Sequence, residues 1–202
     1  NGDFELDSGN AANTFNVGTG NVNLGATGSA AVRNVTVNTG TVVIGGTISN
    51  GTNTTTSALT KKGTATLVLS GTNSYTGGTT ISAGRLNVSG SLGTGNVSVA
   101  NGATLELDTG TAIADSAGLT LATGAVLDLT GSINETVHSV VLGSTTFNTP
   151  IVFSPDNNYQ GFGSTFFQGS TGTLTVAVPE PGTLSLLSIA GLGMLWRRSI
   201  KA

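Results

Sequence analysis

Acidic residues are the first candidates for chemistry in this sequence, because paired carboxylates can act on a glycosidic bond or bind calcium. After its first seven residues the chain has no acid until Glu106, which Asp108 and Asp128 follow. If the apolar runs Leu105–Leu107 and Leu127–Leu129 stack, Glu106 and Asp128 lie side by side on an outer face, flanked by inward leucines. Because isolated outward acids on a solenoid are usually solubilising, we expect that role here, and the lack of a nearby Arg or Lys in the sequence argues against a catalytic site.

The single histidine, His138, could act as a base with Ser139 as nucleophile and Asp128 as the orienting acid. A catalytic triad needs three converging groups, and the sequence has no nucleophile elbow of the form Gly-x-Ser-x-Gly. We expect His138 to face solvent from a strand. Lys61 and Lys62 are interpreted as a solvated turn, and Gly77-Gly78 as a turn without the features of a phosphate site.

The composition excludes several classes of protein. With no cysteine and one histidine, the chain cannot build a Cys/His metal site. It has 7 Lys and Arg against 10 Asp and Glu, and its only basic cluster is at the end, so a nucleic-acid partner is excluded. We therefore expect no catalytic, cofactor-binding or metal-binding residues.

The body of the chain consists of short alternating runs bounded by Gly or Asn. Each run reads apolar–any–apolar, which is typical of a strand with one buried face. No stretch before residue 183 has the spacing of an amphipathic helix, so the body is predicted to be all-β. The clearest runs are Val22–Leu24, Val35–Val37, Thr41–Ile44, Leu67–Leu69, Leu86–Val88, Val97–Val99, Leu105–Leu107, Leu119–Leu121 and Val126–Leu129.

Short strands of this kind fit either a β-sandwich or a β-solenoid. A sandwich usually buries large aromatic residues, and residues 16–146 contain a single aromatic residue, Tyr75. Small side chains suit the narrow interior of a parallel β-solenoid, whose turns stack Val, Leu and Ile on one another. We therefore predict solenoid repeats over residues 1–146, with Thr, Ser and Asn on the outer faces.

The best-matching repeat covers residues 59–107. Its first part reads L-T-K-x-G-x-A-x-L-x-L-x-G-x-N-x-Y-x-G-x-T-x-I-x-x-G-x-L-x-V, from Leu59 to Val88. This pattern resembles the autotransporter-associated β-strand repeat, with Ala65 in place of a second glycine. The resemblance implies a right-handed parallel β-helix on a bacterial surface or secreted protein, and it implies no catalytic activity. Residues 16–58 and 108–142 look like degenerate versions of the same unit.

The composition changes at Phe147, since five of the seven Phe lie between Phe147 and Phe167. A solenoid needs atypical end turns to cover its open core. We interpret residues 147–177 as an aromatic-rich cap or terminal strands. The alternative is an aromatic surface that binds a ligand.

Residues 178–202 form a tail with three parts. They are the motif Val178, Pro179, Glu180 and Pro181, an uncharged apolar run over residues 183–196, and the basic end 197–201 with Arg197, Arg198 and Lys201. The apolar run is shorter than the roughly 20 residues that span a bilayer comfortably. Because a basic cluster follows it, we predict a short transmembrane helix whose basic end stays cytoplasmic.

The tail resembles the PEP-CTERM protein-sorting signal in all three parts. The resemblance implies a partner, exosortase, which is a membrane-embedded cysteine transpeptidase that processes such tails near the Pro-Glu-Pro motif. It also implies a Gram-negative-type bacterium and export by the general secretory route. Val178, Pro179, Glu180 and Pro181 are then a recognition site for another enzyme.

These observations predict a non-enzymatic exported protein of the cell surface or extracellular matrix, a β-helical stalk that its C-terminal helix anchors transiently in the membrane. Extracellular polysaccharide is a further expected partner through the hydroxyl- and amide-rich faces. The alternatives are an adhesin for a specific glycan or protein, and a polysaccharide-active β-helix enzyme. Because the chain begins at Asn1 with neither Met nor a secretory signal, we expect it to be a fragment of a longer protein.

Overall fold

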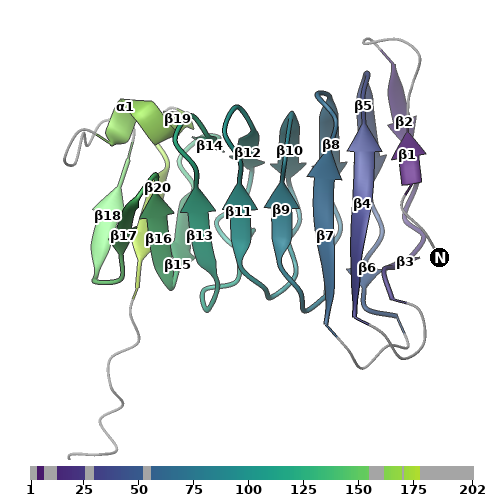
Figure 1. Cartoon of the computed structure of the whole chain (residues 1–202), viewed down its shortest axis with the longest axis horizontal. Coiled ribbons are helices and arrows are strands. Elements are labelled where there is room, and N and C mark those ends of the chain that lie inside the picture. The colour runs from purple at the N-terminus through teal and green to yellow at the C-terminus, as the bar shows by residue number, and fades with distance from the viewer. Residues whose placement is uncertain are drawn as a thin grey trace, which may run out of the picture.

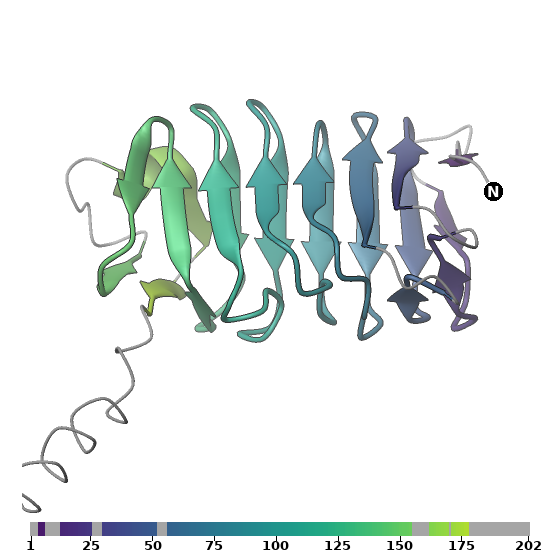
Figure 2. The same cartoon turned by 60° about the horizontal axis from the view of Figure 1, so that its bottom comes forward.

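The computed structural model describes residues 4–6, 13–25, 30–51, 56–154, 162–169 and 171–177. Their strands wind into a parallel β-solenoid whose long axis is horizontal in Figures 1 and 2. Each turn passes from one long sheet to a second and then along a third side before it returns to the first. The prediction of an all-β parallel solenoid is confirmed.

The first long sheet has eight strands in the order β1-β4-β7-β9-β11-β13-β16-β17. Neighbouring strands are parallel except for β17, which pairs antiparallel with β16. The strands are β1 (Phe4–Leu6), β4 (Ala31–Val37), β7 (Ser57–Lys62), β9 (Thr79–Ile81), β11 (Val97–Val99), β13 (Gly118–Leu121), β16 (Ser139–Leu142) and β17 (Thr145–Phe147).

The second long sheet has seven strands, all parallel, in the order β19-β14-β12-β10-β8-β5-β2. They are β2 (Thr14–Asn16), β5 (Thr41–Ile44), β8 (Thr66–Leu69), β10 (Arg85–Val88), β12 (Thr104–Leu107), β14 (Val126–Leu129) and β19 (Phe167–Gly169).

The third side is less regular than the two long sheets. At the N-terminal end, β3 (Val22–Asn23) pairs with β6 (Ile48–Ser49). In the middle, an isolated bridge joins Thr72 and Ser91. At the C-terminal end, β15 (Asn134–Val137) pairs parallel with β20 (Thr173–Val176), which pairs antiparallel with β18 (Ile151–Phe153).

Alternating side chains explain the strands. Leu67 and Leu69 of β8 are fully buried, whereas Thr66 and Val68 between them are partly exposed. Each buried residue lies on its counterpart in the next turn, so the apolar runs form continuous rows along the axis. The turns between the long sheets need a positive φ, which glycine adopts at little cost: Gly63 has a φ of 76° and Gly84 of 66°.

The C-terminal end contains an insertion between β16 and β19. Within it, β17 lies against β16, β18 lies against β20, and the short helix α1 (Gly163–Phe166) packs near β14 and β19 (Figure 1). Its phenylalanines pack on one another: the ring centroid of Phe153 is 5.0 Å from that of Phe147 and 5.4 Å from that of Phe167. All three are at most 9% exposed, so they do not form the open aromatic surface of the alternative interpretation.

Candidate functional site

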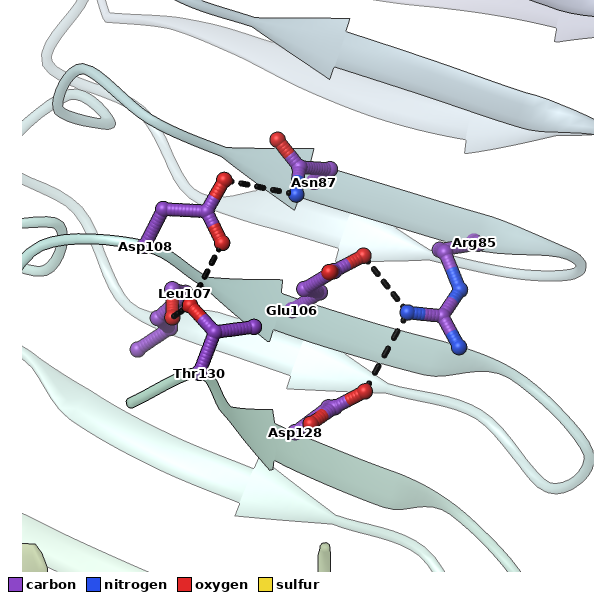
Figure 3. A network of polar contacts seen from close by, with 7 residues as sticks. All are labelled: Arg85, Asn87, Glu106, Leu107, Asp108, Asp128 and Thr130. Carbon is purple, nitrogen blue, oxygen red and sulfur yellow. Dashed lines mark hydrogen bonds and ion pairs between the residues drawn. The ribbon is translucent and has the colours of Figure 1, made fainter. Parts of the chain in front are cut away.

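The charged outer face of the seven-stranded sheet is the first candidate site (Figure 3). The parallel register aligns Asn87 of β10 with Glu106 of β12 and Glu106 with Asp128 of β14. Leu105 and Leu127 stack beneath them, as the sequence predicted. Burial of the leucines therefore forces the intervening side chains outward, into one row along the axis.

One arginine joins two acids of this row. Nη1 of Arg85 lies 2.5 Å from Oε2 of Glu106 and 3.2 Å from Oδ2 of Asp128. The hydrogen bond to Glu106 raises the pKa of Arg85 above its ordinary value, so the guanidinium stays charged. The Arg85 side chain is 39% exposed, which makes this a surface ion-pair network.

The third acid, Asp108, has neutral partners. Its Oδ2 accepts a hydrogen bond from Nδ2 of Asn87 at 2.9 Å, and its Oδ1 accepts one from Oγ1 of Thr130 at 2.7 Å. Thr130 also donates to the carbonyl of Leu107 at 3.0 Å. Asp108 thus joins three successive turns just beyond the C-terminal end of β12.

The sequence-based view that no basic residue lies near these acids is wrong. Arg85 is 21 positions before Glu106 and 43 before Asp128, yet one and two turns of the solenoid bring it beside them. The ion pairs hold both carboxylates as acceptors, whereas general acid catalysis needs one of them to donate a proton. The part of the chain that the structure describes encloses no pocket at this face and has no group of three His, Asp or Glu that could hold a metal ion.

The structure does not bring the three residues of the possible catalytic triad together, namely His138, Ser139 and Asp128. Asp128 binds Arg85 on the seven-stranded sheet, while Ser139 begins β16 on the eight-stranded sheet. His138 is exposed, as expected, but it lies at the bend between β15 and β16 and not within a strand. Its backbone N–H donates to the carbonyl of Ala117.

The prediction that Lys61 belongs to a solvated turn is also wrong, because this residue is fully buried. It lies in β7, and its Nζ donates to the carbonyls of Lys62 at 2.8 Å, Gly63 at 2.7 Å and Ala83 at 3.1 Å. Burial lowers the pKa of Lys61 to about 8. The ammonium group satisfies backbone acceptors at the corner where two turns meet, a structural role. Its neighbour Lys62 is exposed.

Asn73 and Tyr75 fill the third side of the same turn. Oδ1 of Asn73 accepts from the N–H of Ile48 at 2.8 Å, and Nδ2 donates to the carbonyl of Ser91 at 2.6 Å, so one side chain links three turns. The fully buried Tyr75 shares a 2.6 Å hydrogen bond with Thr79. Asn73 therefore supplements the backbone hydrogen bonds between turns where the third side lacks a long strand.

Glu135 is a buried acid that the sequence analysis did not single out. It is fully buried on β15, and its carboxylate accepts N–H groups from Ala112 at 3.1 Å and Ile113 at 3.0 Å. Burial raises the pKa of Glu135 to about 7; Asp115 also raises it, and the two N–H groups oppose the shift. Glu135 and the apolar Val137 are two positions apart and therefore share one face of β15. This spacing was the sequence signal that Glu135 points inward.

The tail residues Val178, Pro179, Glu180, Pro181, Arg197, Arg198 and Lys201, and the predicted transmembrane helix over 183–196, lie outside the described residues. Within the described ranges, no helix has the length and apolar character to cross a membrane. The roles of the tail residues and the domain boundaries stay predictions.

Comparison with known proteins bears on both motifs. Residues 59–88 match the passenger-associated-transport-repeat family, and residues 177–199 match the PEP-CTERM protein-sorting motif. A stretch of 57 residues is 53% identical to the adhesin BmaC autotransporter of Brucella suis biovar 1 (strain 1330). That stretch is 26% of this chain and only 2% of the relative. No solved structure matches the chain.

The matches coincide with the two sequence patterns and with the geometry. The repeat match contains Lys61 and Asn73, whose contacts join successive turns, and the buried Tyr75. Together with the solenoid, these findings fit an exported β-helical surface protein. The chain thus carries an autotransporter-associated repeat within a parallel β-solenoid and, after it, a PEP-CTERM protein-sorting motif.

Proposed function

We propose that the chain is a non-enzymatic stalk of the bacterial surface or extracellular matrix. The observation that carries this proposal is how the polar groups are used. Arg85, Glu106 and Asp128 bind one another on the surface, while inside Lys61 binds the carbonyl of Ala83 and Glu135 binds the N–H groups of Ala112 and Ile113. In each case the contact joins successive turns, which is what a rod requires.

The tail supplies the delivery step of this proposal. Exosortase recognises Val178, Pro179, Glu180 and Pro181, the apolar run 183–196 holds the chain in the membrane, and Arg197, Arg198 and Lys201 remain on the cytoplasmic side. The match to the PEP-CTERM motif over residues 177–199 supports this order of events. The membrane anchor is transient because processing near the motif releases the solenoid.

Delivery can be tested by labelling intact cells of an exosortase-containing bacterium with an antibody to the solenoid. The wild-type chain should be labelled, whereas Glu180→Ala with Pro179→Ala should remain in the membrane fraction. Pro150→Ala is the matched control, because it changes an exposed proline outside the tail. Equal labelling of the tail variant and the wild type would refute the sorting step.

Adhesion to polysaccharide is a second function, favoured by the outer face of the eight-stranded sheet and by the match to a protein named as an adhesin. Along this face Thr80, Ser98 and Thr120 are aligned by register and exposed. Such hydroxyl groups can exchange hydrogen bonds with sugar hydroxyls. Glycan-array binding by the purified chain should be lost in the triple change to Val; no binding by the wild type would exclude this role.

A further inference from the structure

Two described turns of the solenoid carry the dipeptide Asn-Gly, at Asn50-Gly51 and at Asn101-Gly102. Asparagine is a chemically labile residue. Its side-chain carbonyl carbon can be attacked by the backbone nitrogen of the following residue, and a glycine there hinders the attack least because it has no side chain. Each pair is therefore a candidate site at which the chain modifies itself without an enzyme.

The backbone is similar at the two pairs. Gly51 has a φ of 71° and Gly102 of 76°, so both glycines hold the left-handed conformation of a tight turn. The N–H of Gly51 donates to Oγ of Ser49 at 3.1 Å. The N–H of Gly102 donates to the carbonyl of Gly124, also at 3.1 Å. The attacking nitrogen is thus in a comparable state in both turns, and the main difference is the asparagine side chain.

The side chain of Asn50 is held through both its oxygen and its nitrogen. Oδ1 accepts N–H groups from Ser57 at 3.3 Å and from Thr76 at 3.2 Å, and Nδ2 donates to Oγ1 of Thr76 at 2.8 Å. To react, the carbonyl carbon of this group must turn toward the nitrogen of Gly51, and that rotation breaks the contacts with Thr76 in the next turn. These hydrogen bonds therefore protect Asn50.

The side chain of Asn101 has no hydrogen bond in the described part of the chain, and it is exposed. It lies over the backbone of Gly124, where a Cβ would come within 2.6 Å of Oδ1 of Asn101. The side chain of Asn101 and the N–H of Gly102 thus face the same residue of the next turn. A side chain at Gly102 would meet no described atom within 4 Å, so water has free access to this pair.

We propose that Asn101 is a site of spontaneous deamidation, which limits the chemical lifetime of the solenoid. The nitrogen of Gly102 forms a bond to Cγ of Asn101, and the side-chain nitrogen leaves as ammonia with the proton of the Gly102 N–H. Water then opens the resulting cyclic imide at either of its carbonyls, which leaves aspartate or isoaspartate at position 101. The net change is the loss of one ammonia and the gain of one water.

Isoaspartate at position 101 disturbs the corner between the two long sheets. It leads the main chain through the side-chain carbons, so the turn from Ala100 to Ala103 becomes one bond longer. That turn is tight, since the N–H of Ala103 donates to the carbonyl of Ala100 at 3.0 Å. The hydrogen bond from Gly102 to Gly124 joins the same turn to the next one. Deamidation therefore weakens the contact between two successive turns.

Peptide mass spectrometry of the full chain, kept folded in a mild detergent and sampled over weeks, tests the proposal. The peptide with Asn101 should gain one mass unit and contain isoaspartate. It should do so about tenfold or more faster than the peptide with Asn50, because each hydrogen bond that must break slows the reaction at Asn50. In concentrated urea the two peptides should react at similar rates. Equal rates in the folded chain, or the same ratio in urea, would overturn the proposal.

Two variants test the protection and the consequence separately. Thr76→Val removes the acceptor of Nδ2 of Asn50 and should speed deamidation of Asn50 but not of Asn101. Asn101→Gln should keep its unfolding midpoint during storage, whereas the midpoint of the wild type should fall as isoaspartate accumulates. An unchanged rate at Asn50 in Thr76→Val would contradict protection by these contacts. An equal fall of the midpoint in wild type and Asn101→Gln would contradict the lifetime role of Asn101.

Discussion

Polar side chains inside the solenoid and polar side chains on its outer face hold the turns together in different ways. Inside, Lys61 binds backbone carbonyls at the corner between the two long sheets. Asn73 and Glu135 bind backbone groups on the third side, where long strands are missing. Outside, Arg85, Glu106 and Asp128 bind one another in contact with water. The interior groups are thus part of the backbone hydrogen bonding, whereas the surface groups can be replaced by water.

This difference separates residues that the fold needs from residues that are free to contact a partner. Loss of a buried donor or acceptor leaves its backbone partner unsatisfied, which costs about 1–3 kcal/mol for each group. Loss of an exposed ion pair costs about 0–1 kcal/mol, because solvent takes over. The following changes test whether the two sets differ as strongly as their burial indicates.

Lys61→Met should have the largest effect. Three backbone carbonyls lose their donor in a fully buried place, so we expect the free energy of unfolding to fall by about 4 kcal/mol. Lys62→Met, at the exposed neighbouring position, should change it by less than about 0.5 kcal/mol. Urea unfolding of both variants gives the comparison, and equal effects would remove the distinction between inside and outside at this corner.

Glu135 should make the stability of the protein fall as the pH rises toward neutrality. Its pKa is raised to about 7 in the folded state, so its stabilising effect is complete below about 4.5 and is lost as the pH rises through 7. The shift corresponds to about 3 kcal/mol. The free energy of unfolding of the wild type should therefore fall relative to that of Glu135→Gln between pH 4.5 and 7.5, and a difference that stays constant with pH would contradict this account.

Asn73→Ala should cost about 1–2 kcal/mol, because the N–H of Ile48 loses its acceptor and the carbonyl of Ser91 keeps only the backbone N–H of residue 73 as a donor. Asn87→Ala is the control on the outer face, where Asn87 donates to Asp108 in contact with solvent. Its cost should be a few tenths of a kcal/mol. Thermal unfolding of the two alanine variants would disprove the account if Asn87 proved the more sensitive position.

Arg85→Gln should have the smallest effect, below about 1 kcal/mol, and 1 M salt should reduce the effect further. The measurement is the denaturation midpoint of wild type and variant at low and high salt. A loss of several kcal/mol that salt does not change would mean that the outer network is as essential as the interior contacts.

The sequence was informative wherever alternation alone decides the position of a side chain. Stacking of Leu105 and Leu127 followed from their runs, and so did the outward alignment of Glu106 with Asp128. Arg85 was missed as their partner because two turns of different length separate it from Asp128, and only the register places it there.

Buried polar residues were harder to predict than apolar ones. Lys61 and Glu135 occupy inward positions of their strands. A charged side chain is normally not found at such a position unless buried groups form hydrogen bonds with it. Here these groups belong to the backbone of a neighbouring turn, which no local pattern identifies. The antiparallel strands β17 and β18 were missed for a similar reason, since direction depends on tertiary pairing.

The most direct test of the central claim, a structural rod delivered by a sorting tail, is the mass of the protein's C-terminus in cells with and without exosortase. We predict that the chain ends near residues 178–181 when exosortase is present and still carries its tail to Ala202 when exosortase is absent. An intact tail in both kinds of cell would contradict the account.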